Sequence, residues 1–173
     1  IVIANCSFDG IGKITVESEY AHQPWINNQF INTKHFSLEQ GEGNISFYGN
    51  RFIDGEPDPM IYSATENDSV YFRKNYMWNY STNSNISQMI SKGKGYNFIS
   101  DNEFIGKSHL AINAYDSTCI INLTNNYINI KEGILYFDGS DAESNRQINV
   151  FNNLIKSDLP SPTEAIAYLD CVS

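Results

Sequence analysis

The stretch that decides the fold is Ile99-Ser100-Asp101-Asn102-Glu103-Phe104, because its pattern returns along the whole chain. An apolar residue is followed by a turn-forming residue and then by asparagine, and a second apolar residue comes two positions after the asparagine. Spacings of 22, 22, 25, 27, 24 and 27 residues separate the recurring anchor positions. The anchors are Cys6, Asn28, Asn50, Asn75, Asn102, Asn126 and Asn153. Self-similarity at such a period is the signature of a repeat architecture.

Two columns beside the anchors test this alignment. Three residues before the anchor stand Ile3, Trp25, Phe47, Phe72, Ile99, Leu123 and Val150. Two residues after it stand Phe8, Phe30, Phe52, Met77, Phe104, Ile128 and Ile155. All of these residues are apolar in a chain that is only 41% hydrophobic, so chance does not explain the columns. Most residues directly before the anchor are Asn, Gly or Asp, which tolerate the left-handed backbone that a tight bend requires.

Alternating apolar residues within each repeat indicate three short strands per repeat. The composition agrees, because the chain holds 22 Asn, 11 Tyr, 10 Phe and 11 Gly, which favour strands and turns. We therefore expect one all-β domain over residues 1–173, a solenoid of about seven coils of 22–27 residues.

The coil length and the asparagine column resemble the right-handed parallel β-helix of the pectin-lyase-like superfamily. The resemblance covers nearly the whole chain and implies an internal ladder in which each asparagine amide bonds to its neighbours. It says little about activity, since that superfamily includes polysaccharide lyases, hydrolases, phage tailspikes and bacterial adhesins.

The two ends and the sixth repeat suggest surfaces that something else covers. The chain starts abruptly at Ile1, which indicates a processed product or a piece of a longer β-helix with adjoining coils. Repeat spacing predicts that the side chains of Leu110, Ile112, Ile134 and Tyr136 point inward. Because side chains alternate along a strand, Leu135 and Phe137 are then predicted to point outward. We expect the Gly139–Asn145 loop, missing coils or another chain to cover those two residues, which leaves a homo-oligomer among the alternatives.

One candidate catalytic cluster lies on the third strand of the first two repeats. In enzymes of the superfamily, substrate lies along this strand. Glu17 and Glu39 share a column there, and Lys13 and His35 share the column two positions away. Two carboxylates about 5 Å apart raise each other's proton affinity and suit general acid–base hydrolysis. The alternative is a solvated β face with incidental charges.

No other catalytic or metal pattern supports an enzyme. The superfamily's hydrolase phrases, Gly-His-Gly and Arg-x-Lys, are missing, and no Cys/His group has zinc spacing. We therefore predict no cofactor and no metal. A group of aromatic residues predicted to face outward suits sugar stacking or a subunit interface. It comprises Tyr62, Tyr71, Tyr76, Trp78 and Tyr80.

Charge and apolar patterning exclude several classes of partner. A net charge of −9 disfavours nucleic acid and anionic membranes, and it disfavours tight binding of polyanionic polysaccharide unless a metal bridges the two. The chain has no apolar run of 18 residues, which predicts no membrane insertion. Three cysteines are an odd number and exclude a full disulfide framework.

Two functions remain after these exclusions. The first is a non-catalytic extracellular or cell-surface β-helix, from an adhesin, tailspike or surface protein, that binds a polysaccharide or a surface protein. The second is part of a polysaccharide lyase or glycoside hydrolase that acts at Glu17 and Glu39.

Overall fold

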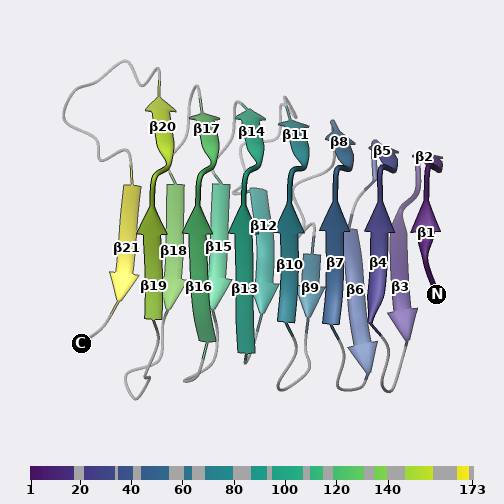
Figure 1. Ribbon diagram of the computed structural model, residues 1–173, viewed down its shortest axis with the longest axis horizontal. Helices are drawn as coiled ribbons and strands as arrows, with labels where there is room; N and C mark the ends of the chain where they lie inside the picture. The colour runs from purple at the N-terminus through teal and green to yellow at the C-terminus, as the bar shows by residue number, and fades with distance from the viewer. Residues whose placement is uncertain are drawn as a thin grey trace.

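The chain forms a parallel β-solenoid without helices in the part that the structure describes. This computed structural model describes residues 1–17, 22–33, 35–40, 44–54, 61–63, 69–79, 87–92, 95–106, 110–114, 119–130, 135–139, 147–157 and 167–171. All the strand pairs among these residues are parallel. The strands form three seven-stranded sheets, which the chain visits in turn (Figure 1).

Sheet A holds the strand that precedes each anchor residue. Its strands are β1 (Ile3–Ala4), β4 (Gln23–Ile26), β7 (Asn44–Tyr48), β10 (Ser69–Arg73), β13 (Gly95–Ser100), β16 (Cys119–Thr124) and β19 (Gln147–Phe151).

Sheet B holds the strand that follows each anchor residue. Its strands are β2 (Ser7–Asp9), β5 (Gln29–Ile31), β8 (Arg51–Ile53), β11 (Tyr76–Asn79), β14 (Glu103–Gly106), β17 (Tyr127–Ile130) and β20 (Leu154–Ser157).

Sheet C returns the chain toward the start of the next repeat, and its strands run opposite to those of sheets A and B (Figure 1). Its strands are β3 (Lys13–Glu17), β6 (His35–Gln40), β9 (Ile61–Ser63), β12 (Ser87–Lys92), β15 (Leu110–Ala114), β18 (Leu135–Gly139) and β21 (Ala167–Cys171).

A two-residue bend joins each strand of sheet A to the next strand of sheet B. The residue before the anchor has a left-handed backbone in all seven bends, as its residue type predicts for most of them. The φ angles are 57° at Asn5, 53° at Asn27, 67° at Gly49, 53° at Lys74, 59° at Asp101, 55° at Asn125 and 55° at Asn152. Lys74 is the exception by type, since lysine adopts this conformation less readily than Asn, Asp or Gly.

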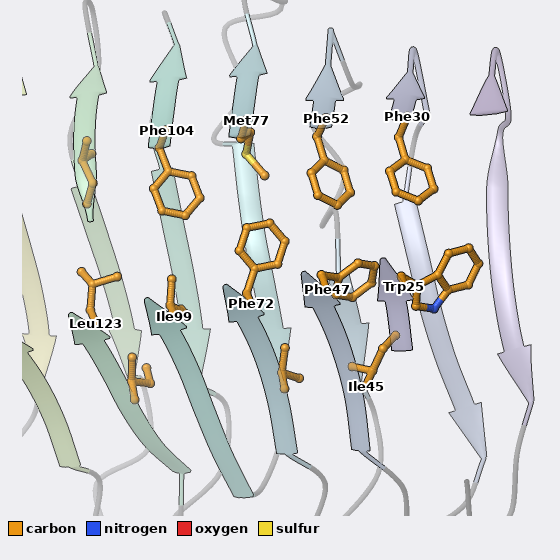
Figure 2. Close-up of a cluster of buried hydrophobic side chains, with 13 residues drawn as sticks. Trp25, Phe30, Ile45, Phe47, Phe52, Phe72, Met77, Ile99, Phe104 and Leu123 are labelled. Atoms are coloured by element: carbon orange, nitrogen blue, oxygen red, sulfur yellow. The ribbon is translucent and has the colours of Figure 1, made fainter. Parts of the chain in front are cut away.

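The two apolar columns form the core, as the spacing predicts. Strand register aligns both columns through all seven strands of sheets A and B. Figure 2 shows Phe30, Phe52, Met77 and Phe104 in one row and Trp25, Phe47, Phe72, Ile99 and Leu123 in the other. Column residues are incompletely buried only in the first and last coils. Ile3, Phe8 and Ile155 are half-buried there, and Val150 is 41% exposed.

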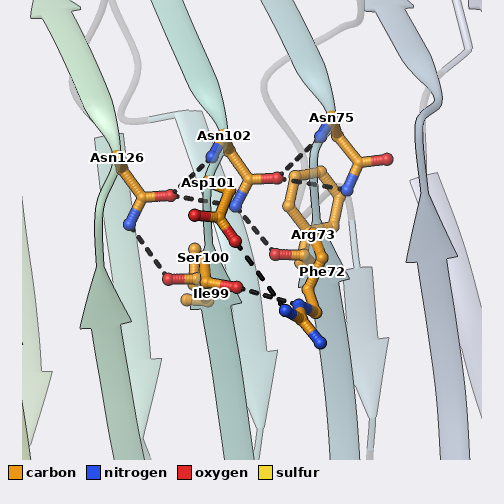
Figure 3. A network of polar contacts seen from close by, with 8 residues as sticks. All are labelled: Phe72, Arg73, Asn75, Ile99, Ser100, Asp101, Asn102 and Asn126. Carbon is orange, nitrogen blue, oxygen red and sulfur yellow. Dashed lines mark hydrogen bonds and ion pairs between the residues drawn. The ribbon is translucent and has the colours of Figure 1, made fainter.

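The anchor asparagines form the predicted ladder. The Oδ1 of Asn102 accepts hydrogen bonds from the backbone N–H of Asn75 at 2.8 Å and from its Nδ2 at 3.2 Å. The Nδ2 of Asn102 donates to Phe72 O at 2.7 Å and to Asn126 Oδ1 at 2.9 Å (Figure 3). Equivalent bonds join Asn28, Asn50, Asn75, Asn102, Asn126 and Asn153 in one line. The ladder therefore satisfies buried backbone groups at the bend, where the sheets are interrupted.

Cys6 begins this line without a side-chain amide. Its backbone N–H still donates to Asn28 Oδ1 at 2.9 Å, and its Sγ lies 3.3 Å from Ala4 O. At the first position of the ladder, only the backbone N–H of Cys6 therefore bonds to the next asparagine side chain.

In sheet C the register corrects the sequence prediction for the sixth repeat. Phe137 pairs with Ile112, and Leu135 pairs with Leu110. Partners in parallel strands lie on the same face of the sheet. The predictions that Ile112 points inward and Phe137 outward are therefore incompatible, so at most one of them is right; the side chains of both residues lie outside the described part of the structure. β18 begins nine residues after Asn126, whereas β15 begins eight residues after Asn102, so equal distances from the anchors do not give paired positions.

Candidate functional site

The predicted catalytic residues lie on β3 and β6, the first two strands at one end of sheet C. Lys13 and His35 are Cα partners, as predicted. Glu17 is the partner of Gln40 rather than Glu39, so the predicted pairing of the two glutamates is wrong. The side chains of Glu17, His35 and Glu39 lie outside the described residues, whereas the Lys13 side chain is exposed.

A register shift between Val16 and Glu17 explains this difference. An extra residue on one strand of a pair moves every later partner by one position and exchanges the faces of the side chains. Equal spacing of Glu17 and Glu39 from their anchors therefore does not place them opposite each other.

The predicted aromatic group divides between two faces of the solenoid. Tyr71 belongs to sheet A, whereas Tyr76 and Trp78 belong to sheet B, and all three are half-buried. The Tyr62 side chain and Tyr80 lie outside the described residues. The expected single cluster is therefore not formed by the residues that can be placed.

A different set of rings gathers on the outer face of sheet A, and we call Tyr71, Tyr96 and Phe98 the ring cluster. Tyr71 stacks on Phe98 with centroids 5.1 Å apart and planes 7° apart. Phe98 also stacks on Tyr96 with centroids 6.2 Å apart and planes 13° apart. Tyr96 is 49% exposed, so a ring in this row is open to solvent.

Sequence alternation could have identified two members of the ring cluster. Asn97 and Ile99 are buried on the inner face of β13, so Tyr96 and Phe98 must occupy its outer face. Ile99 was assigned inward from its column, and its strand neighbours follow from that assignment.

Hydroxyl and amide groups border the ring cluster at three positions, and Ile120 lies beside Tyr96 at a fourth. Ser46 is the Cα partner of Tyr71, Ser69 is the partner of Tyr96, and Asn122 is the partner of Phe98. The Oδ1 of Asn122 accepts a hydrogen bond of 2.9 Å from Asn149 Nδ2, which orients its amide. Together these residues form an aromatic surface with hydrogen-bonding groups at its border.

A second group of exposed side chains lies at the bend between sheets A and B, next to the ring cluster. The Nζ of Lys74 lies 5.4 Å from the centre of the Tyr48 ring. The guanidinium carbon of Arg51 lies 5.2 Å from the centre of the Tyr76 ring. Each contact joins a cation to an aromatic ring from an adjacent strand or bend, as cation–π pairs do.

The described residues show neither a metal-binding group nor a membrane-spanning helix. Within the ranges that the structure describes, no group of three or more His, Cys, Asp and Glu side chains could hold a metal ion. In the same part of the chain, no helix is long and apolar enough to cross a membrane.

Comparison with known proteins adds no assignment. No protein-family model, curated protein or solved structure matches this chain.

Proposed function

We propose that this protein is a non-catalytic extracellular or cell-surface β-solenoid that binds a glycan on the outer face of sheet A. The observation that carries this proposal is the ring cluster, in which the half-exposed Tyr96 continues the stack of Tyr71 and Phe98. Aromatic rings offer apolar contact area with few side-chain rotors to immobilise.

The polar border of the ring cluster supports a sugar over a purely apolar partner. A sugar has apolar C–H faces and a periphery of hydroxyl groups. The C–H faces suit the rings, while the hydroxyl groups suit the side chains of Ser46, Ser69 and Asn122, which can donate and accept hydrogen bonds. A protein surface remains the alternative ligand, because interfaces are also rich in tyrosine.

The strands that carry the ring cluster also hold it rigidly, which favours ligand binding. β10 and β13 carry the ring cluster, and five registered residue pairs join these two strands. Phe72 and Ile99, on the inner face of the same strands, are fully buried. A site held this way loses little conformational entropy when a ligand binds.

The resemblance to the pectin-lyase-like superfamily supports a finer proposal for the fold. We infer a right-handed parallel β-helix of about seven coils. Its asparagine ladder corresponds to the internal ladder of that superfamily. Three sheets of seven strands each, visited in turn, support this coil number. An experimental electron-density map tests it, and left-handed crossovers between the sheets would contradict it.

A second candidate function is polysaccharide lysis or hydrolysis on sheet C. The pairing of Lys13 with His35 favours it, because it brings a base and an imidazole to adjacent strands. Release of new reducing ends from a polysaccharide, lost in Glu39→Gln and in Glu17→Gln, would support this candidate over the first.

Binding of soluble polysaccharides tests the proposed function. Native gels containing neutral, uronate-bearing or sulfated polysaccharides identify a ligand by retarded migration, and calorimetry then measures its affinity. We expect Tyr96→Ala to weaken the affinity by about two- to tenfold, the usual worth of an aromatic stacking contact. Tyr127→Ala is the matched control, because Tyr127 is a half-buried tyrosine on the outer face of sheet B.

Two outcomes would contradict the proposal. One is that no polysaccharide in the panel retards the protein. The other is that Tyr96→Ala and Tyr127→Ala weaken the affinity equally while circular dichroism shows both variants folded.

A further inference from the structure

Three exposed cations gather at one bend of this acidic protein. We call Arg51, Arg73 and Lys74, with the rings of Tyr48 and Tyr76, the cationic corner. Tyr48 and Arg73 are Cα partners on sheet A, and Arg51 and Tyr76 are Cα partners on sheet B. Lys74 occupies the bend between the two sheets, where its φ is 53°. The corner therefore joins the outer faces of sheets A and B.

Aromatic rings hold two of these cations without neutralising them. Lys74 lies over Tyr48 at 5.4 Å and Arg51 over Tyr76 at 5.2 Å. Among the described residues, neither Arg51 nor Lys74 forms an ion pair. Ring contacts restrict the side chains and leave their full charge available to a ligand.

Arg73 is oriented by its neighbours on the next strand. Its Nε donates to Ser100 Oγ at 3.0 Å, and its Nη2 lies 3.8 Å from Asp101 Oδ2 (Figure 3). The Arg73 side chain is still 54% exposed. The remaining guanidinium N–H groups can therefore donate to a ligand from a fixed position.

The local charge at the corner is slightly positive in an acidic chain, because its three cations outnumber the two neighbouring carboxylates, Asp101 and Glu103. The outward positions at this bend, from the first four strands of each sheet, contain three cations and no carboxylate. They are Ala4, Asn5, Ser7, Ile26, Asn27, Gln29, Tyr48, Gly49, Arg51, Arg73, Lys74 and Tyr76.

Carboxylates appear at the same bend only on the following strands, as Asp101 and Glu103. Salt screens exposed charges beyond about 8 Å at physiological ionic strength. Asp101 and Glu103 lie within that distance of the corner, so a bound anion responds to a local sum of three cations and two carboxylates rather than to the net charge of −9.

We propose that the cationic corner binds a tetrahedral oxyanion, a sulfate or phosphate ester, carried by the glycan that the ring cluster holds. This inference rests on the proposed function. Arg73 follows Tyr71 by two residues on β10, about 7 Å along the strand, so one sugar chain reaches both sites.

The number and the type of the cations favour an ester group with several charged oxygens. Arg73 contacts Ser100 and Asp101 on the following strand, Lys74 lies over Tyr48 on the preceding strand, and Arg51 lies on sheet B. An ester sulfate or phosphate presents several terminal oxygens in different directions, whereas a carboxylate presents two oxygens in one plane. Guanidinium and ammonium groups are the usual partners of such oxyanions.

Dextran derivatives test the inference with one sugar backbone. We would measure the affinities of dextran, dextran sulfate and dextran phosphate for the wild-type protein, for Arg51→Gln and for Lys74→Asn. Asparagine at position 74 preserves the left-handed bend. The matched control is Lys156→Gln, because Lys156 is an exposed lysine that also lies over a tyrosine ring, 5.5 Å from the centre of Tyr127.

We expect an ester-bearing dextran to bind more tightly than dextran. Arg51→Gln and Lys74→Asn should each weaken that affinity by about threefold, and together by about tenfold, as exposed charge pairs do. The double variant should also reduce the dependence of affinity on salt, while Lys156→Gln should leave both unchanged. Whichever of dextran sulfate and dextran phosphate binds more tightly identifies the ester.

Failure of this inference is distinct from failure of the proposed function. If dextran binds as tightly as both esters, or if the corner variants bind an ester as the control does, the cationic corner is not an oxyanion site. If Tyr96→Ala leaves the affinity for every glycan unchanged, the proposed function fails instead.

Discussion

Replacing Asn102 by leucine should destabilise the middle of the solenoid strongly. The Asn102 side chain makes four hydrogen bonds, two that its Nδ2 donates and two that its Oδ1 accepts. Leucine removes all four and leaves the N–H of Asn75 and the carbonyl of Phe72 without this partner. Each buried polar group that loses its bond costs about 1–3 kcal/mol. Burial of the leucine side chain offsets about 2 kcal/mol. The two groups together cost about 2–6 kcal/mol, so we expect a net loss of about 0–4 kcal/mol, centred on about 2 kcal/mol, in the free energy of unfolding.

The same substitution at the end of the ladder is the matched control. Asn153 also accepts two bonds from Asn126, at 2.8 Å and 2.9 Å, but its side chain is only half-buried. Water can replace lost bonds there, so Asn153→Leu should cost about 1 kcal/mol or less. Urea denaturation followed by circular dichroism measures both variants.

Hydrogen exchange gives a local readout of the same perturbation. The amide of Asn75 should exchange faster in Asn102→Leu, because it donates to the deleted Oδ1. The amide of Asn28, which donates to Asn50 Oδ1, should be unaffected. Equal losses of stability in Asn102→Leu and Asn153→Leu, or an unchanged Asn75 amide, would refute the role assigned to the ladder.

Three further changes test the bend, the core and the first ladder position. Gly49→Ala should destabilise the protein by more than about 1 kcal/mol in thermal unfolding, because Gly49 has a φ of 67° and an added methyl group would collide with Asn27 Oδ1. Gly10→Ala, with a φ of 66° and open space around the added methyl group, should show the conformational cost alone. Phe72→Ala should cost about 3–5 kcal/mol in urea denaturation, since Phe72 is fully buried among other rings, and a cost below 1 kcal/mol would contradict its place in the core. Cys6→Asn should raise the melting temperature by adding one amide to the ladder, and a lowered value would show that the first position does not accept it.

The sequence by itself determined the repeat, the core of sheets A and B and the asparagine ladder. The apolar residues around each anchor lie within five residues of one another, with a two-residue bend between the strands. This local geometry is constant, so identical spacing gives identical positions. The side chain of Phe72 and the amide of Asn102 could both be assigned from their distance to an anchor.

Only the tertiary structure decided the arrangement of sheet C and of the outer surface. The connection from sheet B to sheet C changes in length between repeats, and a change of one residue reverses which face a side chain occupies. A longer connection pairs Phe137 with Ile112, and a register shift between Val16 and Glu17 pairs Glu17 with Gln40, both contrary to the spacing. The ring cluster and the cationic corner depend on neighbours that lie 22–27 residues apart in the chain. Their contacts form only when the strands stack in register.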